Sequence, residues 1–236
     1  MNWEKLSIPI AIIGAGLILG AAVYFQPQFS PTEDNLAAVG DLDQSDISLE
    51  NVRPLTTEDN IKGSLEAPII IIEYSDPDCS FCHRFHNTLK EIVDLYDDNQ
   101  VAWVYRHFNV FGSASAQKSI AFECAGELEN NSGFWSYLEA FHQGIDQNNK
   151  AGNVDELTSL AGDIGLDTAD FRECLESERP KNVIETDTDN AIASGGSGTP
   201  FSLIKLPSGE IVELGGAVPT ENLIEIIDEL LEAPEE

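Results

Sequence analysis

Basic side chains are scarce in this 236-residue chain. Lys and Arg together number 12 against 42 Asp and Glu, which gives a formal net charge of −30 at pH 7. Because a protein holds nucleic acid mainly through phosphate contacts from a basic patch, this composition excludes a nucleic-acid partner. The acidic excess indicates a solvated, self-repelling surface, with a cation-binding role as the alternative.

The sequence shows no internal repeats. One long apolar run near its start contains no charged residue. Leu6 through Phe25 contain no charged residue, and about 20 apolar residues span a bilayer core as a helix. Lys5 precedes the run, which favours a cytoplasmic amino terminus. The sequence therefore predicts a single-pass anchor in the cell membrane over residues 1–25, with the remainder outside the cytoplasm. A cleavable signal peptide is the alternative, because Leu19–Ala22 offers small residues.

Residues 26–57 show little hydrophobic periodicity. Pro, Asp, Glu, Ser and Gln recur there, which is the composition of a flexible, extended tether. We expect one folded domain over residues 58–236, a length that fits common domain sizes.

Cysteine is rare, but two of the four cysteines stand close together in Cys79-Ser80-Phe81-Cys82. They follow the apolar run Pro68–Ile72 and open a segment with helical periodicity. Two cysteines three apart face the same side of a first helical turn, where unpaired N–H groups and the helix dipole favour a thiolate. The pattern indicates a reactive dithiol at a strand–helix junction.

Other readings of this motif remain open. Cys79 to His83 also spells C-x-x-C-H, which can mark haem attachment. The only methionine is Met1, so a second axial ligand would have to be histidine. Zinc could take Cys79, Cys82, His83 and His86, although all four lie within eight residues and structural sites usually use two separated pairs. A purely structural Cys79–Cys82 disulfide is disfavoured, because so small a loop constrains the unfolded chain little.

The hydrophobic pattern predicts alternating strands and helices around a helical middle. We expect strands over Ile69–Tyr74, Val101–His107, Phe201–Leu206 and Ile211–Leu214, and helices over Cys79–Leu95, Ala114–Leu128, Phe134–Ile145, Val154–Ile164, Thr168–Glu176, Pro180–Ala193 and Glu221–Leu231.

A second motif lies far downstream, at Thr199-Pro200. With the dithiol, the strand before it and a closing helix, it resembles the thioredoxin superfamily, in which an X-Pro dipeptide with a cis bond faces the dithiol. An ordinary proline that begins a strand is the alternative. Four further segments narrow the resemblance to the DsbA-like branch: Glu73–Asp76, Phe85–His86, Val104–Phe108 and Gly133–Trp135. The resemblance covers about residues 58–233 and implies a thioredoxin-like α/β fold with a helical insertion at about 112–194.

The resemblance implies a membrane-tethered thiol-disulfide oxidoreductase without cofactor or metal. It would introduce disulfides into exported protein clients and be reoxidised by a quinone-linked membrane partner of the DsbB or vitamin K epoxide reductase kind. An isomerase or reductase of the same fold, and a non-catalytic client-binding module, stay open as alternatives.

Roles follow for individual residues. We expect Cys79 to be an exposed nucleophile and Cys82 to resolve the mixed disulfide. Glu73 stands where the resemblance implies a buried acid that relays a proton to the inner cysteine, and burial should raise its pKa. Its alternative role is to cap a strand or pair with a basic residue. Thr199, beside Pro200, should present its backbone to a bound client strand.

Nearby charges leave the redox direction open. Asp76 and Asp78 would raise the pKa of Cys79 by repulsion, and protonated His83 or His86 would offset this. Three further residues, His107, Trp135 and His142, are expected to be core or surface residues rather than ligands.

The other two cysteines, Cys124 and Cys174, fall in the expected insertion. The resemblance implies a structural disulfide between them, since similar second bridges occur in some DsbA-like proteins, and four cysteines in an exported chain invite pairing. Two separate buried thiols are the alternative.

Overall fold

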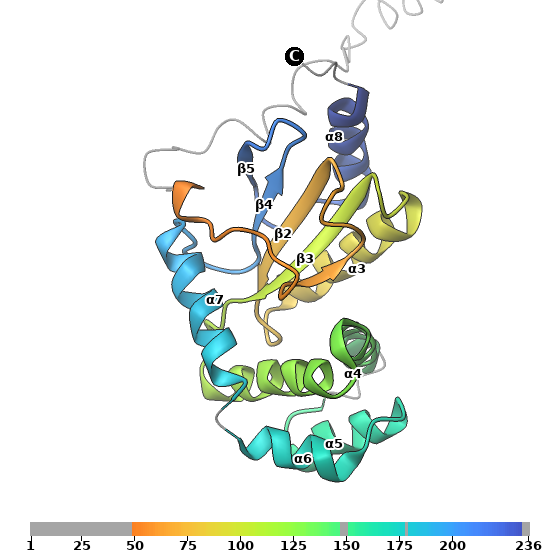
Figure 1. The fold of residues 1–236 in the computed structure, drawn as a ribbon, viewed down its shortest axis with the longest axis vertical. Helices are drawn as coiled ribbons and strands as arrows, with labels where there is room; N and C mark the ends of the chain where they lie inside the picture. The colour runs from red at the N-terminus through yellow and green to blue at the C-terminus, as the bar shows by residue number, and fades with distance from the viewer. Residues whose placement is uncertain (1–48, 147–150, 178, 233–236) are drawn as a thin grey trace, which may run out of the picture. The chain divides into compact units, whose positions relative to one another are not determined.

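The structure, a computed structural model, describes residues 49–146, 151–177 and 179–232 (Figure 1). Its elements in chain order are η3 (Leu49–Asn51), β1 (Asn60–Lys62), β2 (Ile69–Ser75), α3 (Ser80–Leu95), β3 (Val101–His107), α4 (Ser113–Asp146), α5 (Val154–Asp163), α6 (Thr168–Glu176), α7 (Lys181–Ala193), β4 (Phe201–Lys205), β5 (Ile211–Leu214) and α8 (Thr220–Glu232). The anchor expected over residues 1–25 lies outside the described residues. Among the helices that the structure does describe, none has the length and apolar character needed to cross a membrane.

Five strands form one mixed sheet in the order β1-β3-β2-β4-β5. β2 and β3 are parallel, and every other neighbouring pair is antiparallel. The central strand β2 is buried along its whole length, which agrees with its unbroken run of isoleucines. Since successive side chains point to opposite faces, Ile69 and Ile71 join one hydrophobic cluster and Ile70 and Ile72 join the other.

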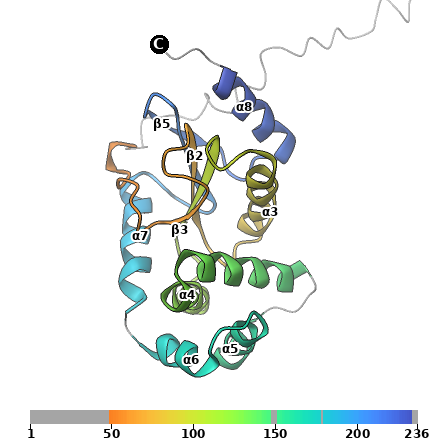
Figure 2. The ribbon, with the colours of Figure 1, turned by 45° about the vertical axis from the view of Figure 1, so that its right-hand side comes forward.

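Helices cover both faces of this sheet. α3 and α8 pack on one face and α7 packs on the other (Figures 1 and 2). α3 buries Phe85, Leu89 and Ile92, which recur at the three- and four-residue spacing of an amphipathic helix. This packing fixes the amino end of α3 next to the carboxyl end of β2.

The helical insertion begins with α4, which contains a kink. The sequence predicts two helices with a break between positions 128 and 134, and this is confirmed: α4 is two helical halves joined at a kink, where the backbone leaves helical angles at Glu129 and Asn130. Asn130 has φ 57° and ψ −155°, a positive-φ conformation outside both the right-handed and the left-handed helical regions, so the helix changes direction there. A Cβ on Gly133 would lie 2.2 Å from the carbonyl oxygen of Ala125, so the close approach of the two halves requires glycine.

The folded domain begins earlier than composition indicates. Val52 is buried, and the Arg53 guanidinium forms ion pairs with Asp59 at 2.7 Å and with Asp187 of α7 at 2.9 Å. Placing residues 49–57 in the flexible tether was therefore wrong, because a few specific contacts with α7 hold a segment that has no periodicity. The three-residue edge strand β1 was missed for a related reason: it is too short to show an alternating pattern.

Candidate functional site

The dithiol lies at the first turn of α3. Cys79 is the N-cap residue, with φ −79° and ψ 117°, and its sulfur accepts a hydrogen bond from the Cys82 backbone N–H at 3.3 Å. A sulfur thus takes the place of the oxygen acceptor that usually caps a helix start. A negatively charged sulfur is stabilised in this position, because the helix dipole and the Cys82 N–H both favour an anion.

Asp76 shapes the turn that delivers Cys79 to this position. Its buried carboxylate accepts hydrogen bonds from the backbone N–H groups of Asp78 at 2.8 Å, Val110 at 2.7 Å and Phe111 at 3.0 Å, and from the Ser115 hydroxyl. The loop after β3 is thereby attached to the loop before α3. Asp76 was expected only to repel a thiolate, but its charge is taken up by these donors.

Asp78, the second expected source of repulsion, is also compensated. Its carboxylate forms an ion pair with Lys118, a residue of α4 that is largely buried. Neither Lys118 nor the hydrogen-bond donors to Asp76 were anticipated. They come from a segment about 40 positions away, and only the fold brings them to the dithiol.

The Thr199–Pro200 loop covers the dithiol from the opposite side. The peptide bond between these residues is cis, and the Cys79 thiol donates a hydrogen bond to the Thr199 carbonyl oxygen at 3.2 Å. Cys79 is only 4% exposed, so the expectation of an exposed nucleophile was wrong: the proline loop packs over the sulfur. Cys82, at 1%, is the more buried of the two.

The two sulfurs have pKa values shifted in opposite directions. The hydrogen bond from the Cys82 thiol, with further bonds from Thr199 and from backbone N–H groups, outweighs burial and lowers the pKa of Cys79 to about 6. Burial, followed by the hydrogen bond to Cys79 and the charge of Glu73, raises the pKa of Cys82 far above its ordinary value. At neutral pH Cys79 is a thiolate and Cys82 a thiol.

Glu73 lies on β2, fully buried on the α3 side of the sheet. Burial raises its pKa to about 8, even though the Ser75 hydroxyl donates to Oε1 at 2.8 Å. Its other oxygen, Oε2, has no hydrogen-bond partner in the part of the chain that the structure describes, and no basic residue pairs with it. The pairing alternative therefore does not hold, and the residue is a protonated acid at neutral pH.

The rings of His83 and His86 contact residues of α4. The ring of His142 stacks on that of His86, with centroids 3.8 Å apart, and on that of His83 at 5.0 Å. The Nδ1 atoms of His83 and His142 lie 2.7 Å apart, so one donates to the other. Within the described ranges, no group of three or more His, Cys, Asp or Glu side chains is arranged to hold a metal ion.

The remaining residues that the sequence singles out lie in the core of the domain, except Trp135, which is partly buried against it. His107 is fully buried and its Nε2 lies 2.8 Å from the Glu123 carboxylate. Trp135 packs edge-on against Trp103, with centroids 4.6 Å apart. In the insertion, a disulfide joins Cys124 of α4 to Cys174 of α6 across a sequence separation of 50.

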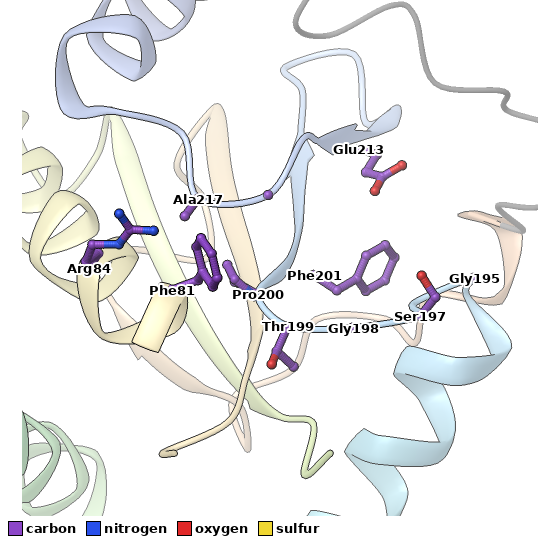
Figure 3. Close-up of a pocket in the computed structure, with 11 residues that line it drawn as sticks. Phe81, Arg84, Gly195, Ser197, Gly198, Thr199, Pro200, Phe201, Glu213 and Ala217 are labelled. Atoms are coloured by element: carbon purple, nitrogen blue, oxygen red, sulfur yellow. The ribbon is translucent and has the colours of Figure 1, made fainter. Parts of the chain in front are cut away.

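A groove of about 460 Å³ runs past the proline loop (Figure 3). Its lining residues come from α3 and from the segments on either side of β4 and β5: Phe81, Arg84, Gly195, Ser197, Gly198, Thr199, Pro200, Phe201, Glu213, Gly216 and Ala217. Phe81 is 55% exposed, and the Arg84 guanidinium lies 4.6 Å from its ring centroid. Thr199 and Pro200 were expected at the site and Phe81 as part of the dithiol motif; the sequence did not predict the groove that they form with the other lining residues, because no local pattern marks side chains that meet only through the fold.

Comparisons with known proteins agree with this architecture. A family model described as Thioredoxin matches residues 56–228. DsbA2 of Pseudomonas aeruginosa superposes with a TM-score of 0.62 at 28% sequence identity, over 78% of this chain and 100% of that one. Alpha-DsbA1 of Wolbachia pipientis gives 0.65 at 26% identity, over 78% and 95%. The expected thioredoxin-like α/β fold with a helical insertion is confirmed.

Several curated relatives are named as antiporters rather than as oxidoreductases. The Na(+)/H(+) antiporter NhaA 3 of Salinispora tropica is 27% identical over 201 residues, which are 85% of this chain and 29% of the relative. This chain therefore spans less than a third of that relative's length.

Proposed function

Because this chain belongs to the thioredoxin family and has the fold and dithiol of a protein thiol-disulfide oxidoreductase, we propose that it introduces disulfides into exported proteins. The proposal depends on one observation, the opposite tuning of the two sulfurs. The pKa of Cys79 is lowered to about 6, while that of Cys82 is raised. Stabilising the Cys79 thiolate stabilises the reduced enzyme, and an enzyme whose reduced form is stabilised acts as an oxidant.

The reaction proceeds by two thiol-disulfide exchanges. A client thiolate attacks Cys79 Sγ of the oxidised Cys79–Cys82 disulfide, so a mixed disulfide forms and Cys82 leaves as a thiolate that takes up a proton. A second client thiolate then attacks the client sulfur of the mixed disulfide, and Cys79 leaves as a thiolate. The client dithiol loses two electrons, and the enzyme disulfide gains them.

Glu73 is the proton source for Cys82 in this scheme. With a pKa of about 8 it is protonated at neutral pH, and its interaction with Cys82 raises the pKa of that thiol. A thiolate that leaves next to a protonated acid takes up the proton at once, which disfavours the reverse attack of Cys82 on the mixed disulfide.

The cellular setting is part of the proposal. The anchor over residues 1–25 would hold the enzyme in the cell membrane, with a cytoplasmic amino terminus and an extracytoplasmic catalytic domain. A quinone-linked membrane protein would accept the two electrons from the reduced dithiol. The antiport activity named for the Salinispora relative is not proposed for this chain, because the match covers 29% of that protein.

The reduction potential of the Cys79–Cys82 couple tests the direction of transfer. The purified full-length chain is equilibrated with glutathione buffers, and the reduced fraction is measured by alkylation and mass spectrometry. We expect a value of about −120 mV, and a value of about −270 mV would make the protein a reductant. Cys124 and Cys174 provide an internal control, because their alkylation should not follow the same buffer series.

Two further assays separate the alternatives. Faster recovery of activity from scrambled than from reduced ribonuclease would favour an isomerase. Unchanged client binding in a Cys79→Ser/Cys82→Ser variant, with no redox defect, would favour a client-binding module.

A further inference from the structure

The groove beside the proline loop contains a carboxylate without a partner. Glu213, on the edge strand β5, lines the groove, and its Oε2 atom is buried without a hydrogen-bond partner. No described residue forms an ion pair with it either. A buried anionic oxygen without a partner is costly, so a cationic group that entered the groove would be stabilised there.

The two ends of the groove differ in charge. Figure 3 shows Glu213 and Phe201 side by side at one end, and Arg84 with Phe81 at the other, with Thr199 and Pro200 between them. A basic side chain would be repelled by Arg84 and attracted by Glu213. This asymmetry gives a bound chain a preferred direction.

The wall between the two ends leaves room for an extended backbone. A Cβ added at Gly198 or Gly216 would meet no other atom within 4 Å. The Cys79 thiol donates a hydrogen bond to the carbonyl of Thr199, and Thr199 itself lines the groove. A client chain bound in the groove would therefore lie next to Cys79 Sγ.

We infer that Glu213 makes this enzyme select clients with a lysine or arginine close in sequence to the reacting cysteine. The inference rests on the proposed function, because it names the clients of the same dithiol. The net charge of −30 acts in the same direction, since it attracts basic chains at long range. Burial also raises the pKa of Glu213, as expected for a carboxylate that lacks a cation in the unbound protein.

The test uses dithiol peptides that differ at one position. A Lys, Gln or Glu residue is scanned through the three positions on each side of the first cysteine, and kcat/KM for oxidation by the full-length chain is measured. At one of these positions the wild-type protein should prefer Lys over Gln by about fivefold, the effect expected of one partly exposed ion pair. The preference should appear in KM and weaken at high salt.

Matched variants assign the preference to Glu213. Glu213→Gln should abolish it and Glu213→Lys should reverse it toward the Glu peptide. Glu210→Gln, which removes an exposed carboxylate from the loop that precedes β5, should retain it. Thermal unfolding checks that each variant folds. A Glu213→Gln variant that still prefers Lys, or wild type without any preference, would overturn the inference.

A binding assay distinguishes this failure from failure of the proposed function. Fluorescence anisotropy with S-methylated peptides measures affinity without thiol chemistry. Equal oxidation of all peptides would remove the inference and leave the oxidase. A Lys preference in binding without any oxidation would support Glu213 and overturn the proposed function.

Discussion

The four cysteines of this chain form two pairs in contrasting surroundings. Cys79 and Cys82 are free thiols, three residues apart at a helix start, with backbone donors and a carbonyl around the outer sulfur. Cys124 and Cys174 form a disulfide between α4 and α6, within the large hydrophobic cluster and 50 residues apart. All four sulfurs are nearly inaccessible, so exposure does not separate the pairs.

The difference lies in the polar groups that reach each sulfur. Around Cys79, hydrogen bonds favour the thiolate, and a groove lies beside the proline loop. Around Cys124 and Cys174, the packing residues are mainly apolar, although a carboxylate oxygen of Glu127 lies 3.6 Å from Cys174 Sγ, and the bond closes a long loop of the unfolded chain. The first pair is built for exchange and the second for stability.

Replacing either cysteine of the dithiol with serine should cause the largest loss of activity. Cys79→Ser removes the attacked sulfur, so oxidation of a dithiol peptide should fall to the uncatalysed rate. Cys82→Ser keeps Cys79 but cannot form the Cys79–Cys82 disulfide that a client thiolate attacks, so catalysed oxidation should be lost in this variant as well. If Cys79→Ser retained catalysis, the contrast between the two pairs would be wrong.

Removing the second pair should affect stability instead. A Cys124→Ala/Cys174→Ala variant loses a loop closure over 50 residues, which the chain-entropy relation values at about 4 kcal/mol. Urea unfolding of the wild-type and variant proteins measures the difference. Below the unfolding transition, the variant should oxidise peptides at a rate close to wild type, and a large loss there would assign a catalytic role to the insertion disulfide.

Glu73→Gln should remove proton transfer to Cys82 without changing the charge at this position at pH 7. At pH 7 the neutral side chain of Glu73→Gln resembles the protonated acid, whose pKa is about 8, so the Cys79 pKa should change little. Formation of the mixed disulfide, the step in which Cys82 leaves, should slow by about 100-fold, the lower range for losing a positioned acid–base group. Stopped-flow detection of mixed-disulfide formation on the oxidised protein measures this step, with alkylation of reduced Cys79 as the control. An unchanged rate of formation would remove the proton-relay role.

Changing pH should sharpen the contrast without mutation. Since the pKa of Cys79 falls from 9.0 to about 6 on folding, the unfolded chain binds more protons between these values. The thiolate therefore stabilises the reduced protein fully above pH 9, and this contribution is lost as pH falls through about 6. Urea unfolding of reduced and oxidised protein from pH 5 to 9 tests this. As pH rises, the free energy of unfolding of the reduced protein should increase relative to that of the oxidised protein. A difference that does not change with pH would contradict the lowered pKa.

Removing one compensating charge should give the smallest effect. Lys118→Met leaves Asp78 without its ion-pair partner beside Cys79, so the thiolate should become less favourable. Alkylation of Cys79 at pH 6.5 should slow by about threefold, as for one partly exposed pair. Lys90→Met is the matched control, because Lys90 pairs with Asp94 one turn further along α3, away from the dithiol. Equal rates for both variants would mean that Lys118 does not tune the sulfur.

Much of the fold could be predicted from local pattern. Strand β3 and helix α6 have the expected bounds, and α3 begins one residue later than expected because Cys79 is its cap. Each of these segments has a period of two or 3.6 or a continuous apolar run, which a sequence displays directly. The sequence does not predict β1 or the docking of residues 49–57, because both depend on partners far along the chain.

The sequence by itself determined the reactive chemistry, since the spacing of Cys79 and Cys82 before a helical segment specifies a dithiol at a helix start. Only the tertiary structure decided how that dithiol is tuned. Asp76 and Asp78 look repulsive in the sequence, yet donors from the β3–α4 loop and α4 compensate both. Thr199 and Glu213 likewise reach the groove from more than 100 residues away. Electrostatic effects depend on distance and burial in space, and local sequence carries neither.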